Sequence, residues 1–273
     1  MKIADSHNDF LTTLNVEERI KYVGNFKIKI LSCACFTTEK NMTILDVENY
    51  KANVEFLMTK TKCKLLFSIE DVGFLDFRDV ERLINLKPFS VTLTWNYDNQ
   101  YGGGAYGKSN LTQSGRILVK TLENAGILID TAHMNRKTFA DFLKITKLSI
   151  YNSHSNIYAI KRHKRNLIDN QIKSIVESGG YLGITLYDEF IGKNVSSLTI
   201  AKQFDYLIRN FGDKNFGFGT DFYGISSDHL SIDIKDYPDL KKVAHHLKKM
   251  GHSRKTINNI MWRNFTRFVK RRY

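Results

Sequence analysis

Short apolar runs alternate along the chain with longer segments in which apolar residues recur every three or four positions. The longer spacing gives a helix one apolar face, whereas a short, dense apolar run is typical of a buried strand. The sequence contains eight such runs: KIADSH, KIKILSCACF, CKLLFSIE, PFSVTLTW, GILIDTAH, LSIYNSH, GYLGITLY and NFGFGTD. Eight alternations of strand and helix predict an α/β fold with a parallel sheet closed into a (β/α)8 TIM barrel. A doubly wound open sheet is the structural alternative.

The helical spacing is clearest in two segments, at residues 44–58 and 198–211. Asn135 and Ser253 stand directly before two further segments of this kind. Both residue types accept hydrogen bonds from the first free N–H groups of a helix, so we expect both to be N-caps.

The chain length fits one large barrel. The chain has 273 residues, of which 42% are hydrophobic and 25% charged, and this composition argues against disorder. Only Pro88 and Pro238 interrupt it, and no linker-like stretch divides it. We therefore expect residues 1–273 to form a single catalytic barrel domain.

The N-terminal residues and the three cysteines indicate the cellular compartment in which the protein works. The first ten residues, MKIADSHNDF, turn polar after four positions, and no apolar run approaches the roughly 18 residues of a membrane span. Cys33, Cys35 and Cys63 form no C-x-x-C motif and are expected to be buried thiols of a reducing compartment. These features predict a cytoplasmic protein with no membrane partner.

The charge is unusual, because 41 Lys+Arg against 28 Asp+Glu give a net charge of +13. Basic runs occur at KRHKR (161–165) and at KRRY (270–273). However, no helix-turn-helix, RNP or zinc-finger pattern accompanies them, and basic runs are more often solvated faces. We therefore expect no nucleic-acid partner, and most of the charge stays unexplained.

Side chains able to bind metal close five of the eight apolar runs. They are His7, Asp9, Glu70, His133, His154 and Asp221. Each alone has an ordinary explanation, as an N-cap or a hydrogen-bonded histidine. The carboxyl ends of the strands of a barrel meet on one face, however, and catalytic residues lie there.

Carboxylates crowded on that face would repel one another unless cations lay between them. The set contains imidazole and carboxylate groups but no thiolate, which suits Zn²⁺, Mn²⁺ or Fe²⁺. Six groups are too many for one four-coordinate ion. Two metals that share a carboxylate fit the set better.

Seven motifs together resemble the membrane (renal-type) dipeptidase family. They are DSHNDF, LTWNYDNQYGGG, LTQSGRILVKTLENAGILIDTAHMN, IYNSHSN, KRNLIDNQI, GFGTDFYG and IMWRNFTRF. The resemblance runs in order over essentially the whole chain, and the stretch from Gly126 to Arg165 is its most specific part. The family comprises binuclear zinc peptidases within the amidohydrolase-like (β/α)8 barrels.

The resemblance implies how the metals are held. His7 and Asp9 would hold one ion, His133 and His154 would hold the second, and Glu70 would bridge the two. Two divalent ions per chain, Zn²⁺ in this family, would then supply a bridging hydroxide that attacks the peptide bond.

The resemblance also assigns residues to the substrate. Arg165 matches the arginine that binds the C-terminal carboxylate, and Asp221 matches the acid/base that transfers the proton. Where the family often has a histidine that contacts the substrate, this chain has Trp95. Asn96 or Tyr97 could supply the missing hydrogen-bond donor.

Three other functions compete with this one. Residues 102–109, GGGAYGKS, fit the pattern of a phosphate-binding P-loop, but NYDNQY separates them from the preceding strand. Another barrel metallohydrolase, acting on N-acyl amino acids or phosphoesters, would share the strand-end ligands. A relative with a degenerate, non-catalytic binding site is the third.

The pattern and the resemblance together favour a metal-dependent dipeptidase. Its partner would be a small, dipeptide-like substrate, and the family also allows a homodimer.

Overall fold

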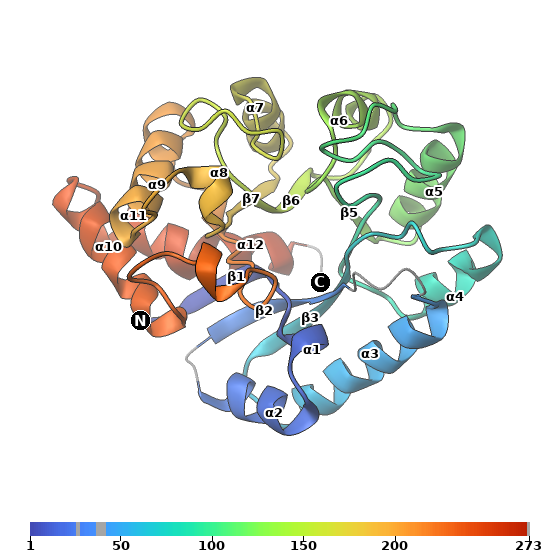
Figure 1. Cartoon of the computed structure of the whole chain (residues 1–273), viewed down its shortest axis with the longest axis horizontal. Helices are drawn as coiled ribbons and strands as arrows, with labels where there is room; N and C mark the ends of the chain where they lie inside the picture. The colour runs from blue at the N-terminus through green and yellow to red at the C-terminus, as the bar shows by residue number, and fades with distance from the viewer. Residues whose placement is uncertain (26–27, 37–41, 272–273) are drawn as a thin grey trace.

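The barrel is closed. The structure, a computed structural model, describes residues 1–25, 28–36 and 42–271, and in them eight parallel strands pair in chain order, with β8 returning to β1 (Figure 1). Each of the eight apolar runs contains one strand, so the predicted (β/α)8 fold is confirmed. The strands are β1 (Ile3–Asn8), β2 (Ile28–Cys35), β3 (Lys64–Ile69), β4 (Ser90–Thr92), β5 (Leu128–Asp130), β6 (Tyr151–Ser155), β7 (Tyr181–Ile184) and β8 (Phe216–Phe218).

Helices surround the strands, as Figure 1 shows. The two segments with clear helical spacing are α3 and α9, and no helix of the described residues is long and apolar enough to cross a bilayer. The α-helices are α1 (Phe10–Thr13), α2 (Val16–Asn25), α3 (Ile44–Met58), α4 (Val80–Asn85), α5 (Gln113–Asn124), α6 (Arg136–Leu143), α7 (Asp169–Glu177), α8 (Asp188–Ile191), α9 (Ser197–Phe211), α10 (Leu240–Lys249), α11 (Arg254–Asn258) and α12 (Asn264–Lys270). Shorter helical turns are η1 (Phe77–Asp79), η2 (Ser227–His229), η3 (Tyr237–Asp239) and η4 (Asn259–Arg263).

Both predicted N-caps are present. The side chain of Asn135 accepts a hydrogen bond from the backbone N–H of Thr138 at 2.8 Å, and that of Ser253 accepts one from Thr256 at 3.1 Å. Of the two basic runs, KRHKR lies in the described part of the chain, whereas residues 272–273 of the second lie outside it.

Aromatic side chains fill the end of the barrel where the strands begin. Phe265 and Phe268 of α12 pack against Tyr151 and Tyr181, with the rings of Tyr151 and Phe268 stacked at 5.5 Å. The buried hydroxyl of Tyr151 donates to the carbonyl of Ser6 at 2.9 Å. This apolar layer seals one end of the barrel, so polar side chains inside the barrel gather toward the other end.

Small serine side chains fill the middle of the barrel. The hydroxyls of Ser32 and Ser68 lie 2.7 Å apart, and Ser90 donates to Ser68 at 3.0 Å. Ser6 donates to the carbonyl of Ser153 at 2.6 Å and thereby links β1 to β6 across the interior. These bonds satisfy polar groups that are out of reach of water.

The segment that fits the P-loop pattern has a different structure. A phosphate-binding loop turns directly from a strand into a helix whose first turn holds the lysine. Here β4 ends at Thr92, Gly104 forms an isolated bridge with Met134, and α5 begins at Gln113, beyond Lys108. The segment therefore lacks the architecture of that loop.

Gly183 is required by close packing inside the barrel. A Cβ at this position of β7 would lie 1.9 Å from the carbonyl oxygen of Ser153 and 2.3 Å from the hydroxyl of Ser6. We expect Gly183→Ala to lower the free energy of unfolding by about 1–3 kcal/mol, as overpacking does in other cores. Gly24→Ala is the matched control, because nothing lies within 4 Å of its Cβ in helix α2 and alanine is favoured there by about 0.5–1 kcal/mol. Denaturant unfolding measures both variants, and equal stability of the two would contradict the packing argument.

Candidate metal centre

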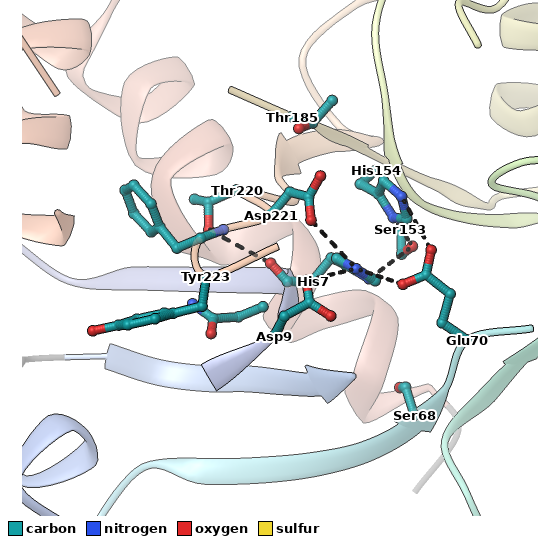
Figure 2. Close-up of polar contacts among 12 residues, drawn as sticks. His7, Asp9, Ser68, Glu70, Ser153, His154, Thr185, Thr220, Asp221 and Tyr223 are labelled. Carbon is teal, nitrogen blue, oxygen red and sulfur yellow. Dashed lines mark hydrogen bonds and ion pairs between the residues drawn. The ribbon is translucent and has the colours of Figure 1, made fainter. Parts of the chain in front are cut away.

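The structure brings all six predicted metal-binding side chains together where the strands end. Figure 2 shows His7, Asp9, Glu70, His154 and Asp221 of this set. They reach the centre from five strands or the loops that directly follow them, and all are buried except the partly exposed Asp221. They are His7 of β1, Asp9 after β1, Glu70 after β3, His133 after β5, His154 of β6 and Asp221 after β8.

Glu70 lies at the middle of the cluster. Its Oε2 is 3.2 Å from Nε2 of His7, whereas its Oε1 is 2.7 Å from Nε2 of His133 and 3.8 Å from Nε2 of His154. Each oxygen of this carboxylate therefore lies closest to a different imidazole, and the rings of His7 and His154 are themselves 3.8 Å apart.

The first side of the cluster consists of Glu70, His133 and His154. Nε2 of His133 and Nε2 of His154 are 2.9 Å apart, so the three ligand atoms lie between 2.7 and 3.8 Å from one another. Ligands of a tetrahedral zinc ion, each about 2.0–2.1 Å from the metal, lie about 3.3 Å apart. The distances among these three ligand atoms therefore fit the ligands of one zinc ion.

The second side of the cluster consists of His7 with three carboxylates. Nε2 of His7 is 3.4 Å from Oδ2 of Asp9 and 3.7 Å from Oδ1 of Asp221, in addition to its contact with Glu70. A Cβ on Gly224 would lie 2.4 Å from both aspartates, so only glycine lets the loop after β8 pass this close to them.

Hydrogen-bond partners from outside the cluster orient all three of its imidazoles. The amide oxygen of Asn96 lies 3.0 Å from Nδ1 of His133, so this nitrogen donates and the lone pair of Nε2 faces Glu70. The hydroxyl of Ser153 lies 2.8 Å from Nδ1 of His154 and 3.4 Å from Nδ1 of His7. Such partners hold metal-binding histidines in the correct tautomer.

The donor set fits divalent cations. Both carboxylate oxygens of Asp9 and Nε2 of His7 are buried without a hydrogen-bond partner in the described structure. Opposite them, the Nε2 lone pair of His133 points at a carboxylate oxygen 2.7 Å away. Buried acceptors that face one another are costly unless a cation lies between them.

The buried imidazoles on the first side are neutral. Burial and the positive charge of Arg165 lower the pKa of His133 to about 4. Burial and His7 hold the pKa of His154 well below its usual range. Neutral imidazole is the form that binds metals, so both residues are ready to act as ligands.

In the metal-free cluster, protons balance the carboxylates. Burial opposes the charge on His7, but Asp9 and Glu70 raise its pKa well above the usual value. Burial likewise opposes the charge on Glu70, but His7 and His133 hold its pKa well below the usual value. Burial and the charge of Asp9 raise the pKa of Asp221 well above its usual value. Divalent cations would take the place of these protons.

Two of the six residues have a left-handed backbone. His133 has a φ of 68° and Asp221 a φ of 62°, a conformation that non-glycine residues rarely adopt. Both lie in the first turn after a strand. Unfavourable backbone conformations of this kind concentrate at functional sites, where they direct a side chain.

Arg165 lies in the wall of the same cavity. Its guanidinium is buried, donates to the carbonyl of His154 at 3.3 Å, and keeps Nε without a partner in the described structure. Burial lowers its pKa to about 10, so it stays charged at neutral pH. A buried cation with free donors can bind an anionic group of a ligand.

Aromatic side chains form much of the remaining wall. The cavity encloses about 330 Å³. Trp95 lies in its wall, with its ring 5.3 Å from that of Phe36 and 6.0 Å from that of His133. Asn96 also lies there, whereas Tyr97 is 68% exposed, packs against Tyr106 and is absent from the wall.

A histidine–aspartate pair at this cavity was not predicted from the sequence. His229 lines the wall, and its Nδ1 lies 2.8 Å from Oδ1 of Asp188. The only available signal was its position eight residues after Asp221, in the loop after the last strand. Ser153 was missed as well, although it directly precedes His154.

Comparisons with known proteins agree with the fold. The family profile for membrane dipeptidases (peptidase family M19) matches residues 26–272. The matched range includes Glu70, His133, His154 and Asp221 but begins after His7.

Two curated relatives are each 28% identical to the chain. An uncharacterized Klebsiella pneumoniae protein in the pqqA 5′ region aligns over 80% of this chain and 86% of its own length. An uncharacterized dipeptidase of Schizosaccharomyces pombe aligns over 66% of this chain and 46% of its own length.

Two solved structures share the fold over almost their whole length. A metallopeptidase of family M19 named dipeptidase AC superposes with a TM-score of 0.87 at 18% identity, over 100% of this chain and 99% of its own. A Rhodobacter sphaeroides metallopeptidase, solved with a phosphinate mimic of the dipeptide L-Ala-D-Ala, superposes with a TM-score of 0.82 at 18% identity over the same shares. At 18% identity, the similarity to these two structures shows that the chain shares their barrel fold.

Ser153→Ala tests the hydrogen bonds that orient the histidines. We expect it to weaken metal binding by about 10–100-fold, as loss of such partners does elsewhere. Competition with a coloured chelator measures the affinity. Ser90→Ala is the matched control, because Ser90 is a buried barrel serine that bonds only Ser68. Unchanged metal affinity in Ser153→Ala would contradict the orienting role.

Proposed function

Because the chain belongs to the membrane dipeptidase family, peptidase family M19, we propose that it hydrolyses the peptide bond of dipeptides with two divalent cations. Membership of this family makes it a peptide-bond hydrolase and implies a divalent metal. The observation that carries the proposal is Glu70, whose two oxygens face separate sets of buried ligand atoms. We assign His7 and Asp9 to one ion, with Glu70 shared.

The second ion is assigned to His133 and His154, again with Glu70. Imidazole and carboxylate ligands without thiolate suit Zn²⁺. When bound, the pair of ions would act as Lewis acids toward the scissile carbonyl and a water molecule.

Asp221 is proposed as the group that moves the proton. Its Oδ1 lies 3.7 Å from Nε2 of His7, beside the carboxylate of Asp9, and it is the most exposed of the six side chains. It can therefore reach both the cluster and a substrate in the cavity. A carboxylate in this position can accept the proton of the attacking water and return it to the leaving amine.

Arg165 is proposed to bind the C-terminal carboxylate of the substrate. It is the buried cation of the cavity wall, and a guanidinium binds a carboxylate through two parallel hydrogen bonds. The cavity of about 330 Å³ is close to the lower end of known ligand pockets and suits a dipeptide. These features favour short peptides with a free carboxyl end.

Asn96 is proposed to support both metal and substrate. It holds His133 through its amide oxygen, and its side chain lies in the cavity wall. Tyr97 stays a prediction, because its side chain lies outside this wall. Trp95, in place of the family histidine, contributes an apolar surface that keeps water from the bound substrate.

We also propose that residues 1–273 form one catalytic domain that works in the cytoplasm. Cys33, Cys35 and Cys63 are buried free thiols, as expected in a reducing compartment. Dipeptides would be its partners, and a homodimer remains a prediction from the family.

Glu70→Gln removes the shared charge while it keeps the size of the side chain. We expect the metal content to fall from about two ions per chain, and dipeptide hydrolysis to fall by about 10³-fold or more, because several kcal/mol of transition-state stabilisation are lost. Elemental analysis and kinetics measure both effects.

Asp71→Asn is the matched control for this variant. Asp71 directly follows Glu70, but it accepts hydrogen bonds from Gly73 and Asn99 instead of facing the imidazoles. Two ions and full activity in Glu70→Gln would contradict the bridging role, provided that Asp71→Asn behaves like the wild type.

Arg165→Lys replaces the planar guanidinium, which can donate two parallel hydrogen bonds, with a single ammonium group. We expect kcat/KM for Ala-Ala to fall by about 10–100-fold, which corresponds to the loss of a charge-assisted pair. The preference for Ala-Ala over its C-terminal amide should shrink as well. Arg162→Lys, three residues earlier and outside this cavity, should change neither value. Intact discrimination in Arg165→Lys would exclude the carboxylate-binding role.

A further inference from the structure

A second cavity lies beside the metal centre, between the start of α6 and the loops after β4 and β6. It is an open cavity of about 440 Å³, and the cationic side chains along it are exposed to solvent. Five cationic side chains line it: Lys108, Arg136, Lys137, Arg162 and Lys164. We refer to it as the basic cavity. None of its lining residues lines the metal-centre cavity.

The five cations have no carboxylate partners. In the part of the chain that the structure describes, none of them forms an ion pair, whereas Arg82, Arg116 and Arg209 each pair with an acidic side chain. Arg136 and Lys137 are also the first two residues of α6, whose first turn has no acidic residue. Cations at the positive end of a helix are unfavourable, so this concentration of charge opposes stability unless an anion is bound.

Neighbouring acidic groups do not neutralise the basic cavity. Asp98 lies behind the loop, where it accepts hydrogen bonds from the backbone N–H groups of Lys108 and Ser109 and from the Ser109 hydroxyl. The negative charge of Glu189 acts on His163 in the cavity wall. Burial, and after it the charge of Arg165, hold the pKa of His163 below its usual value.

Aromatic rings hold two of the cations in place. The guanidinium of Arg136 lies 4.4 Å from the ring centre of Tyr158, and the ammonium of Lys164 lies 5.1 Å from that of Tyr106. The Tyr106 hydroxyl in turn lies 3.2 Å from Nε2 of His163. Side chains held in this way lose less entropy when they bind a ligand.

The loop that carries Lys108 is tightly anchored. The side chain of Asn135 donates to the carbonyl of Ser109 at 2.9 Å, and the backbone N–H of Asn135 donates to Gly103 at 3.0 Å. A Cβ on Gly103 would lie 2.2 Å from the Ser109 carbonyl oxygen, so glycine allows this close approach. The loop is thus a fixed wall of the basic cavity.

We propose that the basic cavity binds a small molecule that carries a phosphate group. A phosphate dianion offers several acceptor oxygens and more charge than one carboxylate, and it suits the planar forks of two arginines. Tyr158 and Ala105 add an apolar surface beside the cations, on which an organic part of the ligand can lie. This site goes beyond the peptidase reaction, and its residues are separate from those proposed for catalysis.

Titration calorimetry of the metal-loaded protein with inorganic phosphate and with phenyl phosphate tests the proposal. We expect saturable binding of both, with the ester bound more tightly if it uses the apolar surface. In the double variant Arg136→Gln/Arg162→Gln the Kd should rise by about 10-fold or more. Dipeptide hydrolysis by this variant should stay at the wild-type level, which shows that it is folded.

A separate cavity lined by lysines provides the matched control. Lys2, Lys29, Lys60 and Lys62 surround it, and the residues described in its wall include no arginine and no aromatic ring. The double variant Lys29→Gln/Lys62→Gln removes the same charge and should leave the Kd within about twofold. Equal loss in both double variants would mean that net charge alone attracts phosphate. Binding that survives Arg136→Gln/Arg162→Gln would place the phosphate elsewhere, including at the metals. Either result, or no saturable binding, overturns the proposal.

Discussion

The carboxylate of Glu70 is the group on which the rest of the site depends. It is buried, and each of its oxygens faces a different set of imidazoles at 2.7–3.2 Å. Buried acceptors at such distances cannot stay together without positive charge between them. Protons on His7 and Asp221 can provide some of it, whereas two divalent cations would satisfy every ligand at once. Bound cations would therefore stabilise this end of the barrel.

The barrel makes this crowding possible. Aromatic rings of α12 seal the end where the strands begin, and serines fill the middle, so polar groups can accumulate where the strands end. Strand β6 is irregular between Asn152 and Ser155, and β1 between Asp5 and Asn8. These irregularities let the adjacent Ser153 and His154 contact each other beside the metal centre, which strict alternation along a strand would prevent.

Much of this architecture could be predicted from the chain. Eight apolar runs indicated eight strands, and metal-binding residues at their ends indicated one shared face. The irregular strands and the left-handed backbone of His133 could not be predicted, because they arise from packing between distant strands. His229 was missed for the same reason, since its partner Asp188 lies far away in sequence. Tyr97 was proposed at the substrate from the resemblance; its side chain is exposed and does not line the cavity, and its role stays a prediction.

The structure shows where part of the excess positive charge lies, which the composition did not reveal. In the run KRHKR, Arg165 turns into the metal cavity, whereas Arg162, His163 and Lys164 line the basic cavity. His163 touches both regions, because its ring packs 4.7 Å from Phe190 and accepts the backbone N–H of Arg165. One short segment thus contributes to both cavities, the proposed site for the peptide carboxylate and the proposed phosphate site.

Glu70 is proposed to be shared by two metal ions, and anomalous X-ray diffraction from crystals of the zinc-loaded protein, measured at the zinc absorption edge, tests this arrangement. We expect two peaks, one beside His7 and Asp9 and the other beside His133 and His154, with Glu70 in contact with both. A single peak, or two peaks of which Glu70 touches only one, would contradict it.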